Sequence, residues 1–341
     1  MARTPDSAYI YASTKVNSAD GVGTETSRLA RLLECTSVRD VYEAVADSGI
    51  CHVTQRLGAV SDSDTVNEVT KLLEGALDSA VSLMREAVPE SRLYDFLLYK
   101  FDCNNIKSAI KSALRGVSAE GTLFSCGSVD TAVVADCVKN RIFSPLPAHM
   151  GRAAAEAIDT FERTGEARSI DFIIDRACFA DMADSAGETE IPMFTEYVKA
   201  LADVTNIRTA VRIARSALAA SAAEALMERV FVPGGNVPMS AFSAEGGGIC
   251  NIEAIAANLP LIPLKAEISG ALDTSTSLDA ILDRYVERTV KNFTSKAFGP
   301  EIPAGFFITR EREIRRYRKA LSLISMGSIK KETLKERLGI L

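Results

Sequence analysis

Three segments of this chain resemble one another at intervals of about one hundred residues. Each contains an anchor residue that is followed directly by isoleucine. The segments are residues 95–114, 196–218 and 304–324, and the anchor pairs are Asn105 with Ile106, Asn206 with Ile207, and Glu313 with Ile314. In the first two copies an aspartate, Asp102 or Asp203, stands three residues before the anchor. We therefore expect one helical unit that is used three times along the chain.

Each copy also carries two cations, placed two and six residues after the anchor. They are Lys107, Lys111, Arg208, Arg212, Arg315 and Lys319. On a helix these positions stack one turn apart, away from the apolar stripe to which the isoleucine belongs. Like charges at this spacing destabilise an isolated helix slightly, which favours acidic partners elsewhere. We predict that the six residues make interdomain or partner contacts; the alternative is a solvated helix face that happens to be basic.

Helical periodicity dominates the sequence, and alternating strand patterns are hard to find. Two residue pairs, Ser37 with Asp40 and Thr65 with Glu68, have the spacing of a capping box at a helix start. Glycine and proline interrupt the helical pattern at residues 18–27, 144–151 and 232–248. The sequence therefore predicts an all-α fold with loops of moderate length.

The length of 341 residues fits two or three domains, and the repeat favours three. We expect three similar helical-bundle domains at residues 1–115, 116–218 and 219–341. Each would contain one copy of the anchor helix.

No pattern in the chain predicts catalysis, a cofactor or a metal. The seven cysteines contain no CxxC pair, and neither His52 nor His149 has a metal-ligand partner at the usual spacing, so we expect reduced, buried thiols in a cytosolic compartment. The phosphate-binding pattern GxxxxGK[ST] is absent as well. Asp171 and Asp175 could suggest an acid–base pair, but their sequence is more typical of a helix start, with Asp171 in the first turn and Asp175 on the polar side.

Charge is distributed unevenly along the chain. The net charge is -6, which gives no general signal for nucleic acid. Residues 310–341 nevertheless contain ten Lys or Arg against four Glu. We expect this basic segment to pair with acidic residues of the same chain; anionic lipid headgroups are the alternative. No apolar run approaches the length of about 18 residues that a membrane-spanning helix needs, and the first residues lack the pattern of a signal peptide.

Several of these motifs resemble one known family. They are FDCNNIKSAIKS (101–112), SIDFIIDRACFADM (169–182), DVTNIRTAVR (203–212), VPGGNVP (232–238) and EREIRRYRKAL (311–321). Together they resemble the C subunit of the prokaryotic V/A-type rotary ATPases, a relative of the d subunit of the eukaryotic V-ATPase. The chain departs from that pattern where Glu313 replaces asparagine, and where Ser13, Thr14 and Lys15 stand in place of an Asn-Ala-Arg type signature.

The resemblance implies three similar helical domains about a pseudo-threefold axis, arranged as a funnel. It also implies a non-catalytic central-stalk protein that joins the D and F subunits of the central shaft to the membrane proteolipid ring and transmits torque for ATP-coupled proton or sodium transport. Such a protein lies on the cytoplasmic face of the membrane without inserting into it, and binds no nucleotide. Independently of the resemblance, we expect no binding of nucleic acid, because the basic segment contains a single aromatic, Tyr317, and the rest of the chain is acidic. The alternatives are a generic helical-repeat scaffold or adaptor, and an α-helical enzyme with a pocket that the sequence does not reveal.

Overall fold

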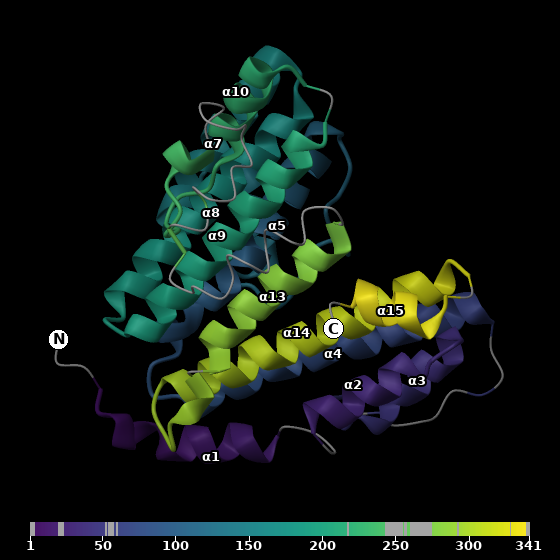
Figure 1. Ribbon diagram of the computed structural model, residues 1–341. Coiled ribbons are helices and arrows are strands. Elements are labelled where there is room, and N and C mark those ends of the chain that lie inside the picture. The colour runs from purple at the N-terminus through teal and green to yellow at the C-terminus, as the bar shows by residue number, and fades with distance from the viewer. Residues whose placement is uncertain are drawn as a thin grey trace. The chain divides into compact units, whose positions relative to one another are not determined.

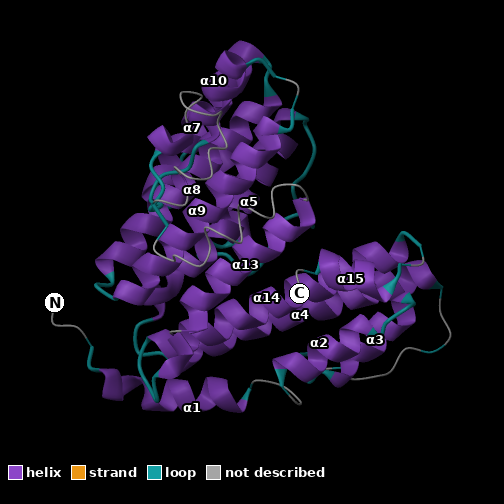
Figure 2. Cartoon of the chain, viewed as in Figure 1, coloured by secondary structure: helices purple, strands orange, loops and turns teal. Residues whose placement is uncertain are grey.

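The computed structural model describes residues 4–19, 24–51, 53, 58, 61–216, 218–242, 255, 258–259, 275–291, 293–327 and 329–338. Within these residues the chain forms thirteen α-helices and four short 3-10 helices, and no strand (Figure 2). The all-α prediction is therefore confirmed. Cys250 and His52 lie outside the described residues. The six cysteines within them are free thiols, and five of the six are buried.

The chain divides into two compact units. We call residues Met1–Ser91, Thr274–Ala280 and Val290–Leu341 the terminal unit, and residues Arg92–Asp273 and Ile281–Thr289 the middle unit. Helix α13 (Ser275–Lys291) contributes residues to both. The division into three domains that the sequence predicts is a different one and stays a prediction.

The terminal unit brings the first and last thirds of the chain together. Its further helices are η1 (Asp6–Tyr9), α1 (Ile10–Ser18), α2 (Glu25–Leu33), α3 (Val38–Asp47), α4 (Asp62–Ala87), η4 (Phe293–Ser295), α14 (Glu301–Ser325) and α15 (Lys331–Arg337), with η2 (Ser91–Tyr94) at its boundary. The two long helices α4 and α14 run side by side, and α1, α2 and α3 pack against them (Figure 1). Leu73 and Met84 of α4 and Phe307 of α14 are among the buried residues of these packed helices.

The basic carboxy-terminal segment pairs with acidic residues of the amino-terminal helices. Both Arg312 and Arg316 lie 2.9 Å from Glu25 of α2. Lys331 pairs with Glu34 just beyond the end of the same helix. The expected intramolecular pairing is therefore confirmed for these residues, and it fastens α14 and the start of α15 to α2.

One of the two predicted capping boxes is confirmed and the other is wrong. The hydroxyl of Ser37 accepts from the Asp40 N–H while the Asp40 carboxylate accepts from the Ser37 N–H, so this box starts α3. Helix α4 begins before Thr65, at Asp62, and its cap is Ser61, which accepts from the Asp64 N–H at 3.2 Å. Two serine or threonine residues at suitable spacing compete here, and the helix uses the earlier one.

The middle unit is built around one long helix, α8 (Ala167–Glu188). Its members are α5 (Asp95–Leu114), α6 (Thr131–Asn140), α7 (Ala148–Thr164), α8 (Ala167–Glu188), α9 (Pro192–Ala214), α10 (Ala220–Val230) and η3 (Met239–Phe242). Helix α8 packs against α5, α7 and α9. Gly165, with a φ of 69°, ends α7 in the left-handed conformation and turns the chain into α8. The Asp181 carboxylate of α8 caps the other end of α7, because it accepts from the N–H groups of His149 and Met150, both at 2.8 Å.

Candidate functional site

The first copy of the repeat binds a loop through a buried polar pair on α5. Asp102 and Asn105 lie one turn apart and are both 0% exposed. The Asn105 amide donates to the Phe124 carbonyl at 2.8 Å and accepts from the Phe124 N–H at 2.7 Å. The two Asp102 oxygens accept from the N–H groups of Ser128 and Val129 at 3.0 and 3.1 Å. The pair therefore satisfies loop backbone that would otherwise be buried without partners.

The second copy repeats this arrangement on α9. The Asn206 amide exchanges two hydrogen bonds of 2.9 Å with the backbone of Val232. Asp203 accepts from the Val237 N–H and from the Asn236 side chain, both at 2.9 Å. In addition, the Tyr285 hydroxyl of α13 donates to Asp203 at 3.3 Å. In both copies an aspartate and an asparagine three residues apart bind a loop. The first two copies therefore share a tertiary contact as well as a sequence pattern.

Glycine is required where each loop passes its aspartate. A Cβ added to Gly127 would lie 2.3 Å from Asp102 Oδ1, and one added to Gly235 would lie 2.4 Å from Asp203 Oδ1. Both distances are far below a normal contact between a carbon and an oxygen. The sequence alone does not reveal why glycine is needed at these positions, because the aspartates that exclude a side chain there lie more than twenty residues earlier.

The third copy keeps the two positions and changes their chemistry. Arg310 replaces the aspartate and Glu313 replaces the asparagine, both on α14 and both buried. Glu313 forms a two-pronged ion pair with Arg28 of α2, with nitrogen to oxygen distances of 2.5 and 3.0 Å. Arg310 donates to the Ala19 carbonyl at 2.9 Å. In this copy the polar pair therefore binds the amino-terminal segment of the chain in place of a loop that follows the helix.

The three isoleucines beside the anchors share one environment. Ile106, Ile207 and Ile314 are 0%, 1% and 2% exposed. Their positions on the apolar side of α5, α9 and α14 are those that the periodicity predicts. Burial of all three agrees with one helical unit used three times.

The predicted cations of the first copy pair with a neighbouring helix. Lys107 lies 2.6 Å from Asp175, and Lys111 pairs with Asp171, one turn away on α8. Burial opposes the charged form of Lys107, but the neighbouring Cys103 and Asp175 outweigh it, so its pKa is raised above the usual range. The carboxylates that could have suggested an acid–base pair are therefore partners of these two lysines. Asp171 lies in the second turn of α8, which begins at Ala167, so its expected place in the first turn is wrong.

The cations of the other copies are placed differently. Arg208 lies 2.7 Å from Asp283 of α13, while Arg212 donates to the Thr209 hydroxyl of its own helix at 3.4 Å. Arg315 pairs at 2.8 Å with Glu311, one turn earlier on the same helix. Both Arg315 and Lys319 are exposed.

The acidic partners of Lys107 and Arg208 belong to a second repeated motif. Residues 169–176 read SIDFIIDR and residues 277–284 read SLDAILDR, so the carboxylates that bind Lys107 and Arg208 occupy matching positions. The anchor-helix pattern alone missed these partners. An internal comparison of α8 with α13 would have found them, because both place two aspartates four residues apart on one helix face.

Comparison with known families decides the assignment. The profile of the family described as ATP synthase (C/AC39) subunit matches residues 25–336 of the chain. The chain belongs to this family. The resemblance seen in the sequence is thereby confirmed, and the protein is one of the subunits of a rotary ATPase. The C/AC39 family is a structural, non-catalytic part of that complex.

Two relatives match most of the chain at low identity, and a third matches a shorter part of it. The A-type ATP synthase C subunit of Thermococcus gammatolerans is 23% identical over 345 residues, which cover 97% of this chain and 90% of the relative. The protein of the same name from Desulfurococcus sp. is 25% identical and covers 81% of this chain and 77% of the relative. That from Haloferax volcanii is 30% identical over a shorter stretch of 140 residues. In the described part of this C/AC39 chain, no helix is both long and apolar enough to cross a bilayer.

Replacing Gly235 with alanine should destabilise the middle unit by about 1–3 kcal/mol, because the new methyl group would push Asp203 away from its loop. Gly187 of α8 is the matched control, since nothing lies within 4 Å of the place its Cβ would take. Alanine there should be neutral or stabilising by up to about 1 kcal/mol. Urea denaturation measures both variants. Equal effects would mean that the loop does not pack on Asp203 in solution.

Asp203 should make stability depend on pH in a direction that the structure fixes. Burial raises the pKa of this carboxyl above its ordinary value, although the hydrogen bonds from Val237 and Asn236 oppose the shift. A carboxyl with a higher pKa in the folded state favours folding fully only below its unfolded pKa of about 3.9, and this contribution is lost as the pH rises through the folded value. The free energy of unfolding of the wild type, minus that of Asp203→Asn, should therefore decrease from about pH 4 upward. A difference that grew with pH would show that the hydrogen bonds outweigh burial.

Proposed function

We propose that this C/AC39 protein is the central-stalk link of a rotary ATPase, joining the D and F subunits of the shaft to the membrane proteolipid ring and transmitting torque between them. The family match over residues 25–336 is the observation that carries the proposal. The chain would act at the cytoplasmic face as a peripheral protein, in a complex that couples ATP to proton or sodium transport. Its own contribution is mechanical.

The buried polar pairs support a mechanical role. A link that transmits torque has to resist deformation, and fully satisfied buried hydrogen-bond networks hold their surroundings in one arrangement. Asp102 with Asn105, and Asp203 with Asn206, fix two loops against the helices. The pair between Arg28 and Glu313 fixes the amino-terminal segment against α14.

The test is purification of the complex through this chain. A tagged copy, isolated from gently solubilised membranes of its host, should bring down both the shaft subunits and the proteolipid ring. Washing the membranes at low salt with a chelator before solubilisation should remove the ring from the purified fraction. Recovery of the shaft without the ring under all conditions would contradict the link to the ring. Recovery of neither would favour a generic scaffold.

We also propose three similar helical domains, at residues 1–115, 116–218 and 219–341, about a pseudo-threefold axis. Support comes from the matching loop contacts of the first two copies and from the use of the same positions in the third. Low-resolution electron microscopy of the isolated protein should reveal three lobes around a central hollow. A compact particle without a hollow would contradict this arrangement.

For the repeated cations we propose two roles. Lys107, Lys111 and Arg208, which pair with aspartates of other helices, would hold neighbouring domains together, and the exposed Arg212 would contribute to docking between domains or to the stalk. The exposed Arg315 and Lys319 would contact another protein of the complex.

Charge reversal of Arg208 together with Arg212 should leave helix content intact, change stability by no more than about 1 kcal/mol because the pair with Asp283 is partly exposed, and weaken the docking of domains. Circular dichroism, urea denaturation and limited proteolysis measure these three effects. Reversal of Arg315 with Lys319 is the comparison, and should reduce only the yield of co-purified subunits. Unchanged proteolysis and assembly in both variants would remove any shared role for the cations.

A further inference from the structure

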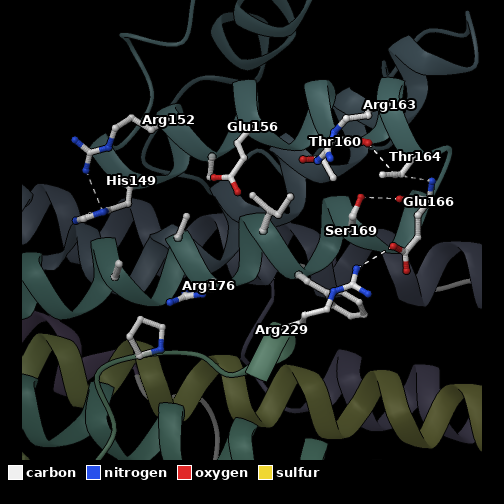
Figure 3. A pocket seen from close by; sticks show the side chains of 16 residues that line it. His149, Arg152, Glu156, Thr160, Arg163, Thr164, Glu166, Ser169, Arg176 and Arg229 are labelled. Atoms are coloured by element: carbon white, nitrogen blue, oxygen red, sulfur yellow. Dashed lines mark hydrogen bonds and ion pairs between the residues drawn. The ribbon is translucent and has the colours of Figure 1, made fainter. Parts of the chain in front are cut away.

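A groove of about 660 Å³ runs along the hairpin of α7 and α8 in the middle unit (Figure 3). Its lining on α7 extends from His149 to Thr164, and the facing side of α8 lines it from Ser169 to Ala180. Arg229 of α10 also lines it. Fifteen residues of helix correspond to roughly 22 Å, so the groove is as long as about four helical turns.

The groove has an apolar floor and a cationic rim. Ala153 and Ala177 are buried along its floor, and the larger Phe172 and Ile173 are half-buried beside them. Four exposed arginines also line the groove, as Figure 3 shows: Arg152, Arg163, Arg176 and Arg229. Small side chains along the floor allow another helix to approach closely. The arginines of the rim favour a helix with acidic side chains on its flanks.

The charges of the groove are only partly balanced. Glu156 and Glu166 are its two carboxylates, and Glu166 is bound to Arg229 at 2.8 Å. Arg163 and Arg176 are exposed, and neither forms a hydrogen bond or an ion pair with the described residues. The lining is thus net positive on a chain whose total charge is -6.

We propose that the groove binds an acidic amphipathic helix of another protein, with the apolar face of that helix on the alanine floor and its carboxylates against Arg163 and Arg176. Amphipathic helices dock into such grooves through residues spaced three and four apart. The arginine fork binds carboxylates with two parallel hydrogen bonds, and arginine is enriched among the residues that dominate binding energy. This inference concerns one surface of the chain and does not depend on the link between shaft and ring.

The test uses the purified full chain and a fluorescein-labelled helical peptide of about 18 residues, with alanine and leucine on one face and glutamate on both flanks. Fluorescence anisotropy should detect binding that weakens with added salt. Arg163→Glu with Arg176→Glu should weaken it at least about tenfold. The matched control is Arg168→Glu, an exposed arginine of α8 outside the groove, which should bind as the wild type does.

Each of the following results would overturn the proposal. One is no binding of the glutamate peptide up to about 1 mM. Another is equal binding of a peptide with lysine in place of glutamate, or equal loss in the Arg168→Glu control. The last concerns the Arg163→Glu with Arg176→Glu variant. If this variant loses binding to phosphatidylglycerol vesicles but still binds the peptide, the arginines would be assigned to lipid. If the charge reversals do not fold, judged by circular dichroism, Arg163→Ala with Arg176→Ala takes their place with the same criteria.

Discussion

Replacing Glu313 with alanine should lower the free energy of unfolding of the terminal unit by roughly 3–5 kcal/mol. The side chains of Arg28 and Glu313 are 4% and 6% exposed, so the change leaves a guanidinium buried beside a cavity. The loss of one partner from a buried ion pair costs far more than the pair contributes, because the remaining charge keeps its full desolvation penalty. Urea denaturation, followed by circular dichroism, measures the effect.

A double variant separates the cost of a stranded charge from the loss of packing. Arg28→Met with Glu313→Leu removes both charges and keeps most of the side-chain volume, so it should recover much of the stability that Glu313→Ala loses. The exposed pair between Arg315 and Glu311 is the control, and Arg315→Ala should change stability by less than about 1 kcal/mol. A small effect of Glu313→Ala would mean that Arg28 reaches water. A double variant as unstable as the single one would mean that lost packing, and not the stranded charge, causes the destabilisation.

Much of the fold could be predicted from local sequence. The apolar stripes require only the period of a helix, and Ile106, Ile207 and Ile314 are buried as that period indicates. The Ser37 cap is equally local and equally correct. The Thr65 prediction failed because two capping signals lie within one turn, and intrinsic preference does not choose between them.

The partners of the repeated polar residues could not be predicted in the same way. A buried asparagine requires hydrogen bonds, but the sequence does not say that Phe124 supplies them for Asn105. The pairing of Glu313 with Arg28 joins residues near opposite ends of the chain, and depends on how α2 packs against α14. In the sequence Glu313 departs from the repeat. The structure explains the departure, because its carboxylate pairs with Arg28.

The repeat also limits what each copy can change. Where a loop follows the anchor helix, an aspartate and an asparagine satisfy its backbone N–H and carbonyl groups, so Asp203 and Asn206 have to be an acceptor and an amide. Where the amino-terminal segment takes that place, the partners are a guanidinium and a carbonyl, and Arg310 with Glu313 suit them. The two positions therefore changed chemistry together while Ile314 kept its place in the core.

Ile207 tests the shared core directly. It is 1% exposed on α9, and aspartate at this position would bring a charge into an apolar stripe with no cation to meet it within that stripe. We expect Ile207→Asp to destabilise the middle unit by more than about 4 kcal/mol, enough to unfold a marginally stable domain. The matched control is Ile142→Asp in the same unit, because Ile142 is 60% exposed and its replacement should cost less than about 0.5 kcal/mol. Thermal and urea unfolding compare the two variants, and similar mild effects would mean that α9 turns a different face to the core.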